Sequence, residues 1–102
     1  MKRIFLTDGS GRWFDVEKAE IFTEAAYWNG ANYVSKSTES PWEHQALYKT
    51  ASGRYILHCW ADLQPALKSL EMISSVVAAK WLAVNEYGPD ELCEEEFAEL
   101  EM

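Results

Sequence analysis

Two short apolar runs separated by a polar turn at the start of the chain predict a β-hairpin. Residues 3–7 and 12–16 are short apolar runs that contain β-branched and aromatic side chains, as strands do. Between them lies the segment DGSG at 8–11, whose glycines supply the positive φ angles that tight hairpin turns need. The pattern therefore predicts two antiparallel strands at the start of the chain.

A helix is predicted over residues 16–28. Its apolar side chains recur at three- and four-residue spacing, at Ala19, Phe22 and Ala26. Asp15 is expected to cap its first turn, since a carboxylate accepts from free helix N–H groups. Asn29-Gly30 is expected to end it, because glycine readily adopts the left-handed conformation of a C-cap.

The second half of the chain predicts a three-stranded meander and another helix. A short strand is expected near NYVS in the polar segment 31–45, and longer strands at 46–50, 55–62 and 69–73, the last two joined by the turn LQPA. Alternation along 55–62 places Ile56, His58 and Trp60 on one face and Leu57 and Cys59 on the other. The helix is expected at 76–87, capped by Ser74 or Ser75 and ended by Gly88-Pro89.

These elements predict an α+β fold in the order ββα-βββα, with an antiparallel sheet and the helices packed on one of its faces. Residues 1–89 are expected to form one domain. Residues 90–102 are expected to form an acidic helix or tail.

The charge of the chain is concentrated in that acidic segment. The formal net charge is -8, but residues 90–102 contain seven of the seventeen acids and no Lys or Arg. Residues 1–87 hold nine Lys or Arg and ten Asp or Glu, which leaves the domain near neutral. No basic cluster is present, so binding to nucleic acid is not favoured. No apolar run approaches the ~18 residues of a membrane span, and the two cysteines suit a reduced, cytoplasmic protein.

Nearly the whole chain resembles a group of small bacterial proteins, including KRIFLTDGSGRWFD at 2–15, YWNG at 27–30 and SPWEHQALY at 40–48. The resemblance is clearest in LYKTASGRYILHCWADLQ at 47–64, then EMIS at 71–74 and AAKWL at 78–82. The group shows the pattern LYRT-x-x-GRW-x-L-x-x-WSQWQGS, a strand ending in Ile-Ser, and EA-x-x-WL-x-x-N. This chain departs from it at 61–66, where only Gln64 of the polar loop is kept. The resemblance implies no activity, since none is established for the group.

The unit Gly-Arg-aromatic occurs twice, in TDGSGRWF at 7–14 and in KTASGRYI at 49–56. A phosphate loop would require glycines that lead into a helix and a following Lys-Ser or Lys-Thr pair. Both units lead into predicted strands instead. They are therefore interpreted as hairpin turns, which leaves the side chains of Arg12 and Arg54 available for contact with a partner.

Catalytic and metal-binding signatures are weak. His44, His58 and Cys59, with a carboxylate such as Glu43, form the one candidate set for a metal or for an enzyme module, but His58 and Cys59 are expected on opposite faces of a strand. Nucleophilic catalysis is not predicted either, because Cys59 is next to His58 in the sequence but on the other face of the strand, and the serines lie in predicted turns and caps. No cofactor and no catalytic residue are predicted.

Aromatic residues favour a protein-binding surface. If the helices cover the Leu57 face of the sheet, the other face exposes apolar and aromatic side chains of the kind enriched at interfaces. The predicted binding residues are Arg12, Trp42, His44, Arg54, Ile56, His58 and Trp60.

The sequence thus predicts a non-catalytic binding or adaptor module whose partner is another protein or a second copy of the chain. A more specific version is a mobile-element product, such as an antitoxin or phage inhibitor, that acts by stoichiometric binding. The alternatives are the metal-dependent or small-molecule enzyme module at His44, His58 and Cys59, and a binder of single-stranded nucleic acid through sheet aromatics.

Overall fold

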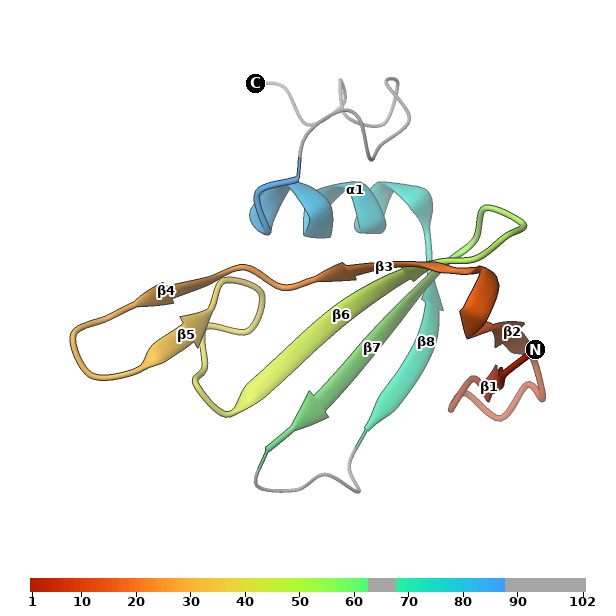
Figure 1. Cartoon of the computed structure of the whole chain (residues 1–102), viewed down its shortest axis with the longest axis horizontal. Helices are drawn as coiled ribbons and strands as arrows, with labels where there is room; N and C mark the ends of the chain where they lie inside the picture. Colours follow the sequence, from red (N-terminus) through yellow and green to blue (C-terminus); the bar gives the residue numbers. More distant parts are fainter. Residues whose placement is uncertain (63–67, 88–102) are drawn as a thin grey trace.

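A computed structural model describes residues 1–62 and 68–87. Its centre is an antiparallel sheet of four strands in the order β3-β6-β7-β8 (Figure 1). These strands are Glu20–Thr23, Glu43–Lys49, Tyr55–Ala61 and Ser69–Ile73. The meander of β6, β7 and β8 confirms the three strands predicted in the second half of the chain.

The register of β6 and β7 divides the sheet into two faces. Leu47 pairs with Leu57 and Gln45 with Cys59, so these side chains share one face. Tyr48 pairs with Ile56, Ala46 with His58 and His44 with Trp60, and these side chains lie on the opposite face. The predicted separation of Leu57 and Cys59 from Ile56, His58 and Trp60 is confirmed.

Helix α1, Ser75–Val84, covers the first face (Figure 1). The hydroxyl of Ser74 accepts from the Val77 N–H at 3.2 Å, which confirms the predicted serine cap. The helix packs its buried residues against Phe22, Leu47 and Tyr55 of three strands; they are Ala78, Ala79, Trp81 and Leu82. This cluster is the larger of the two cores.

The first hairpin covers part of the second face. Strands β1, Arg3–Phe5, and β2, Trp13–Asp15, pair in antiparallel fashion, as predicted. A second core forms between the hairpin and the sheet from Leu6, Phe14, Ile56 and Leu70. Thr7 ties the hairpin to β8, because its N–H and the Leu70 carbonyl form a 2.9 Å hydrogen bond.

A third sheet projects from the domain as a two-stranded arm (Figure 1). Its strands are β4, Ala26–Trp28, and β5, Tyr33–Ser35. Asn29 organises the tip, since its side-chain oxygen accepts from the N–H groups of Ala31 and Asn32, each at 2.9 Å. Gly30 has a φ of 101°, which suits glycine in this turn.

The helix predicted over 16–28 is wrong. That segment contains the 3-10 turn η1, Val16–Lys18, followed by β3 and β4. Asp15 caps only the short turn, through the Glu17 N–H at 3.1 Å, and Asn29-Gly30 turns a hairpin instead of ending a helix. The local helix propensity of this segment is overridden by tertiary contacts, because Phe22 joins the main core only when its backbone pairs with β6.

The order ββα-βββα is therefore replaced by eight strands and one α-helix within residues 1–62 and 68–87. In the same ranges no helix is long and apolar enough to cross a membrane. The turn expected at LQPA, the helix stop at Gly88-Pro89 and the acidic segment 90–102 lie outside the described residues.

Candidate functional site

The two Gly-Arg-aromatic turns lie beside one cleft. In the first turn, Gly11 has a φ of 76° and the Arg12 N–H donates to the hydroxyl of Ser10 at 3.2 Å. In the second, Gly53 has a φ of 85° and the Arg54 N–H donates to the hydroxyl of Thr50 at 3.0 Å. Each turn therefore fixes the backbone of its arginine immediately before a strand and leaves the side chain exposed.

The cleft has a volume of about 570 Å³ and an apolar floor. Leu6, Phe14 and Ile56 form that floor, where the first hairpin packs on the sheet. Ile56 is 3% exposed, so the expectation that it lies on an open sheet face is wrong. The first hairpin buries it, a contact between residues far apart in the sequence.

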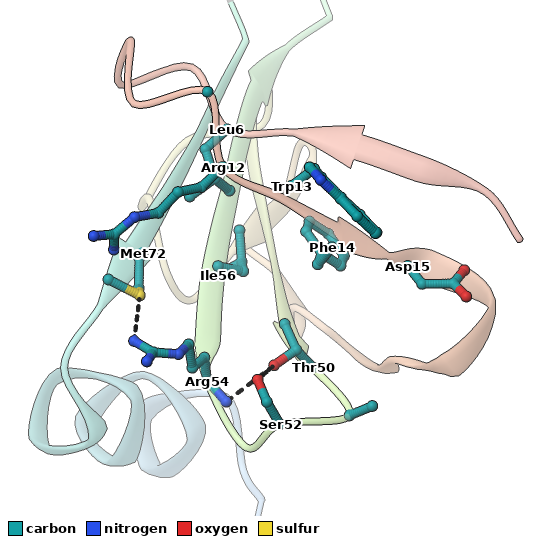
Figure 2. A pocket seen from close by; sticks show the side chains of 12 residues that line it. Leu6, Arg12, Trp13, Phe14, Asp15, Thr50, Ser52, Arg54, Ile56 and Met72 are labelled. Carbon is teal, nitrogen blue, oxygen red and sulfur yellow. Dashed lines mark hydrogen bonds between the residues drawn. The ribbon is translucent and has the colours of Figure 1, made fainter.

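Two guanidinium groups stand at one edge of the cleft. Figure 2 shows the side chains of Arg12 and Arg54 extending to the same side, with Met72 between them. A guanidinium nitrogen of Arg54 lies 3.6 Å from the sulfur of Met72. Within residues 1–62 and 68–87, neither arginine forms an ion pair with a carboxylate.

The other edge carries Trp13 and Asp15. The Trp13 ring is half exposed, and the guanidinium carbon of Arg3 lies 4.8 Å from its centroid. Asp15 accepts hydrogen bonds from the backbone N–H groups of Lys2 and Glu17, each at 3.1 Å. The Lys2 hydrogen bond lowers the pKa of Asp15, so its carboxylate is ionised and already occupied by the local backbone.

This arrangement suits a ligand that carries both an acidic and an apolar group. A guanidinium binds a carboxylate or phosphate through two parallel hydrogen bonds, and two guanidinium groups double the number of donors. The floor of the cleft buries an apolar group beside that charge. Side chains of a protein segment offer both groups at adjacent positions.

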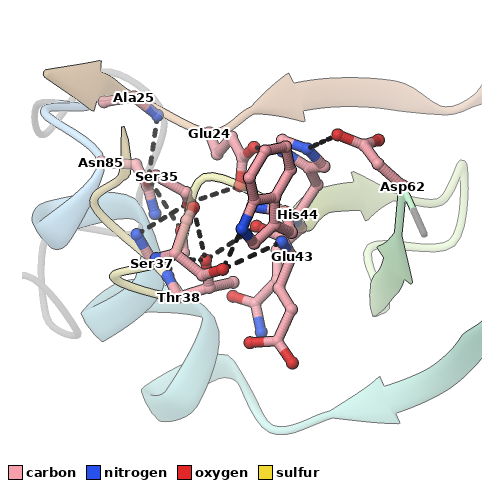
Figure 3. Close-up of polar contacts among 12 residues, drawn as sticks. Glu24, Ala25, Ser35, Ser37, Thr38, Glu43, His44, Asp62 and Asn85 are labelled. Atoms are coloured by element: carbon pink, nitrogen blue, oxygen red, sulfur yellow. Dashed lines mark hydrogen bonds and ion pairs between the residues drawn. The ribbon is translucent and has the colours of Figure 1, made fainter. Parts of the chain in front are cut away.

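A second polar cluster lies at the far end of the same sheet face (Figure 3). His44 sits between two carboxylates, with Nδ1 2.5 Å from Glu24 and Nε2 2.7 Å from Asp62. The other oxygen of Glu24 accepts from the hydroxyl of Ser35 at 2.5 Å and from the Gln45 N–H at 2.8 Å. Both ring nitrogens of His44 and both carboxylate oxygens of Glu24 thus have partners, and the cluster links the arm to β6.

Asn85 continues this network from the end of α1. Its side-chain oxygen accepts from the Ala25 N–H and the Ser37 hydroxyl, both at 2.9 Å, and its nitrogen donates to the Trp81 carbonyl at 2.8 Å. Asn85 is buried, so each of these bonds replaces one that water would make. The network therefore connects the end of α1 to the residues on either side of the arm and has a structural role.

A row of rings connects the two ends of the face. Ring centroids are 6.3 Å apart for Tyr48 and His58, 4.7 Å for His58 and Trp60, and 5.7 Å for Trp60 and His44. Burial, followed by the charge of Lys68, lowers the pKa of His58, so its ring is neutral near pH 7. The predicted residues His44, His58 and Trp60 are therefore neighbours, but they are only partly exposed.

The predicted residues thus separate into three groups. Arg12, Arg54 and Ile56 meet at the cleft, and His44, His58 and Trp60 form the row of rings. Trp42 is exposed near the far end, where its carbonyl accepts from the Asp62 N–H at 2.8 Å. The single surface predicted from the sequence is therefore divided along the length of the sheet.

The metal alternative gains no support from the geometry. His58 and Cys59 lie on opposite faces of β7, and Cys59 accepts from the Gln45 side chain on the helix side at 3.4 Å. The part of the chain that the structure describes holds no group of three His, Cys, Asp or Glu side chains suited to a metal ion. Binding of single-stranded nucleic acid through the row of rings stays a prediction.

Three aromatic residues on the arm were missed because residues 26–28 were assigned to a helix, so the strand predicted near NYVS, which β5 confirms, had no partner strand. Trp28 and Tyr33 are 58% and 70% exposed and contact each other edge to face at 5.2 Å, and Tyr27 is exposed as well. The pair Asn29-Gly30, flanked by aromatic residues, was the available signal, since this dipeptide favours hairpin turns.

Comparisons with protein-family models, curated proteins and solved structures find no match. The resemblance to a group of small bacterial proteins stays a prediction. The function is therefore inferred from the geometry of the cleft.

Proposed function

We propose that this protein is a non-catalytic protein-binding module that takes a partner segment into the cleft between its two Gly-Arg turns. The observation that carries the proposal is the meeting of Arg12 and Arg54, 42 positions apart in the sequence, at the edge of one apolar cleft. The proposed ligand is a short segment that presents an acidic side chain next to an apolar one.

The polar and apolar parts of the cleft have separate tasks in this proposal. The guanidinium groups fix the direction of the segment through hydrogen bonds to its carboxylates. Leu6, Phe14 and Ile56 bury its apolar side chain, which supplies most of the affinity. Exposed Trp13 forms the opposite edge of the cleft, and tryptophan is enriched among the residues that carry most of the binding energy at interfaces.

The arm supports the same class of function. Tyr27, Trp28 and Tyr33 are exposed on a projecting hairpin, and large exposed aromatic groups are enriched at protein interfaces. The more specific role, a mobile-element or phage-type inhibitor or an antitoxin that acts by stoichiometric binding, belongs to the proposal because the domain is small and its binding surface requires no chemistry.

An array of short peptides tests the proposal. Acidic and apolar positions are varied independently, and the array is probed with the labelled full chain. Binding is expected only for peptides that carry both kinds of side chain, with a marked loss of affinity as salt increases.

A charge-reversed variant and a matched control assign the binding to the cleft. Arg12→Glu/Arg54→Glu is expected to abolish binding. Lys18→Glu/Lys80→Glu changes the net charge by the same amount at two exposed lysines outside the cleft and is expected to retain it. Equal binding by both variants would contradict the proposed function.

A further inference from the structure

The chain contains a segment of the composition that the cleft is proposed to bind. Residues 90–102 hold seven Asp or Glu and no Lys or Arg, with Phe97 and Leu100 as apolar side chains among them. We propose that this segment occupies the two-arginine cleft of its own chain and competes there with the partner. The inference rests on the proposed function, since it assigns a regulator to the same site.

Charge complementarity is the first argument. Residues 1–87 are close to neutral, but Arg12 and Arg54 place two positive charges on one edge of the cleft, with no carboxylate paired to them in the described residues. Those charges are thus available to the acids of 90–102. The apolar floor takes Phe97 or Leu100 in the way proposed for a partner side chain.

Chain length is the second argument. Tyr87 is fixed on the domain, where its hydroxyl donates to the Thr23 carbonyl at 3.0 Å. Residues 88–102 span up to about 50 Å when extended, at roughly 3.3–3.6 Å per residue. Leu100 is thirteen residues beyond Tyr87, up to roughly 43–47 Å along an extended chain, and the longest dimension of the molecule is 41 Å, so Leu100 is within reach of the cleft.

Covalent attachment gives this competitor an advantage over a free one. A tethered segment acts at an effective concentration in the millimolar range, whereas a free partner must supply its own concentration. A weakly bound segment therefore excludes weak, non-specific acidic ligands, and a partner must bind the cleft more tightly to displace it.

A disulfide trap tests the proposal on the full chain. Cys93 lies in the acidic segment, and Ser52 lines the cleft on an exposed turn. The variant Ser52→Cys, made together with Cys59→Ser, has two thiols: the one introduced at the cleft and that of Cys93 in the acidic segment. Diamide oxidises the two thiols to a disulfide, and non-reducing electrophoresis with mass spectrometry measures the rate and the mass of the product.

The proposal predicts a disulfide within one monomer. Adding Arg12→Glu/Arg54→Glu, or raising the salt to about 0.5 M, is expected to slow its formation at least tenfold, because the charges no longer hold the segment at the cleft. Adding Lys18→Glu/Lys80→Glu is expected to leave the rate within about twofold. A disulfide-linked dimer, or a rate that the arginine reversal does not change, would overturn the proposal.

A second readout separates this proposal from the proposed function. The variant Glu94→Gln/Glu95→Gln/Glu96→Gln is expected to bind the array peptides several-fold more tightly than the unmodified chain, because its own segment competes less. If an arginine-dependent monomer disulfide forms but no peptide binds either protein, the proposed function fails and the segment–cleft contact stands. If peptides bind both proteins equally, the cleft is a binding site and the competition is absent.

Discussion

The Nδ1 atom of His44 lies 2.5 Å from a carboxylate oxygen of Glu24, at the point where β3 gives way to the arm. Nε2 of the same ring faces Asp62 at 2.7 Å, so the protonated ring donates to both carboxylates. Burial opposes the charge, but the hydrogen bonds that the ring donates to Asp62 and Glu24 outweigh it and raise the pKa of His44 above its ordinary value of 6.5.

The stability of the protein is therefore expected to depend on pH through His44. A raised pKa in the folded state means that the contribution of the protonated ring is complete below the unfolded value of 6.5 and is lost as the pH rises through the folded value. His44→Gln removes this titration, so the unfolding free energy of the variant is expected to fall less than that of the unmodified protein as the pH rises above 6.5. Urea unfolding at a series of pH values measures it.

His58 supplies the opposite control, because burial, followed by the charge of Lys68, lowers its pKa below 6.5. Its neutral ring stabilises the folded state fully above pH 6.5, and this contribution falls as the pH drops through the lowered value. His58→Gln is expected to leave the pH dependence of the unfolding free energy unchanged above pH 6.5. A His44→Gln profile identical to that of the unmodified protein would show that the two carboxylates do not hold a charged ring.

Phe22 and Ile21 test the strand that replaces the predicted helix. They are neighbours on opposite faces of β3, with exposed fractions of 6% and 55%. Phe22→Ala is expected to cost about 3–5 kcal/mol of unfolding free energy, because it empties a core position, and Ile21→Ala is expected to cost less than about 1 kcal/mol. Denaturant unfolding of both variants gives the comparison, and equal losses would speak against the strand.

Asn85 is expected to hold the arm to the domain. Asn85→Ala removes the side-chain partner of the Ala25 N–H and of the Ser37 hydroxyl, and leaving such groups unpaired costs about 1–3 kcal/mol each when they are buried. The Trp81 carbonyl keeps the backbone N–H of residue 85 as a donor, at 3.1 Å. Hydrogen exchange of the arm amides is expected to accelerate as well. Val84→Ala, at the exposed neighbouring position, is the control and is expected to change neither quantity appreciably.

The sequence predicted the strands well where its signals were local. The alternation of faces along the strand predicted at 55–62, the strand at 69–73 and the glycine turns at 8–11 and 51–54 are confirmed, as is the serine cap of α1. The helix prediction for segment 16–28 failed because Ala, Glu and Lys favour helix locally, while Phe22 pairs with Leu47, 25 residues further along the chain.

The candidate site was predicted only in part for the same reason. Free arginine side chains after the two turns follow from turn chemistry, so Arg12 and Arg54 were found. Their meeting at one cleft, and the burial of Ile56 beneath the first hairpin, depend on how that hairpin packs on the sheet. Periodicity carries no information on such long-range contacts.

Binding at the cleft is the central claim, and nuclear magnetic resonance tests it most directly. The array peptide with the highest affinity is added to the full chain labelled at methionine methyl groups and tryptophan indole nitrogens. The account predicts saturable shifts of the Met72 methyl and the Trp13 indole signals, and their loss in Arg12→Glu/Arg54→Glu. Shifts confined to Trp28 on the arm or to Trp60 in the row of rings, with Met72 and Trp13 unmoved, would contradict it.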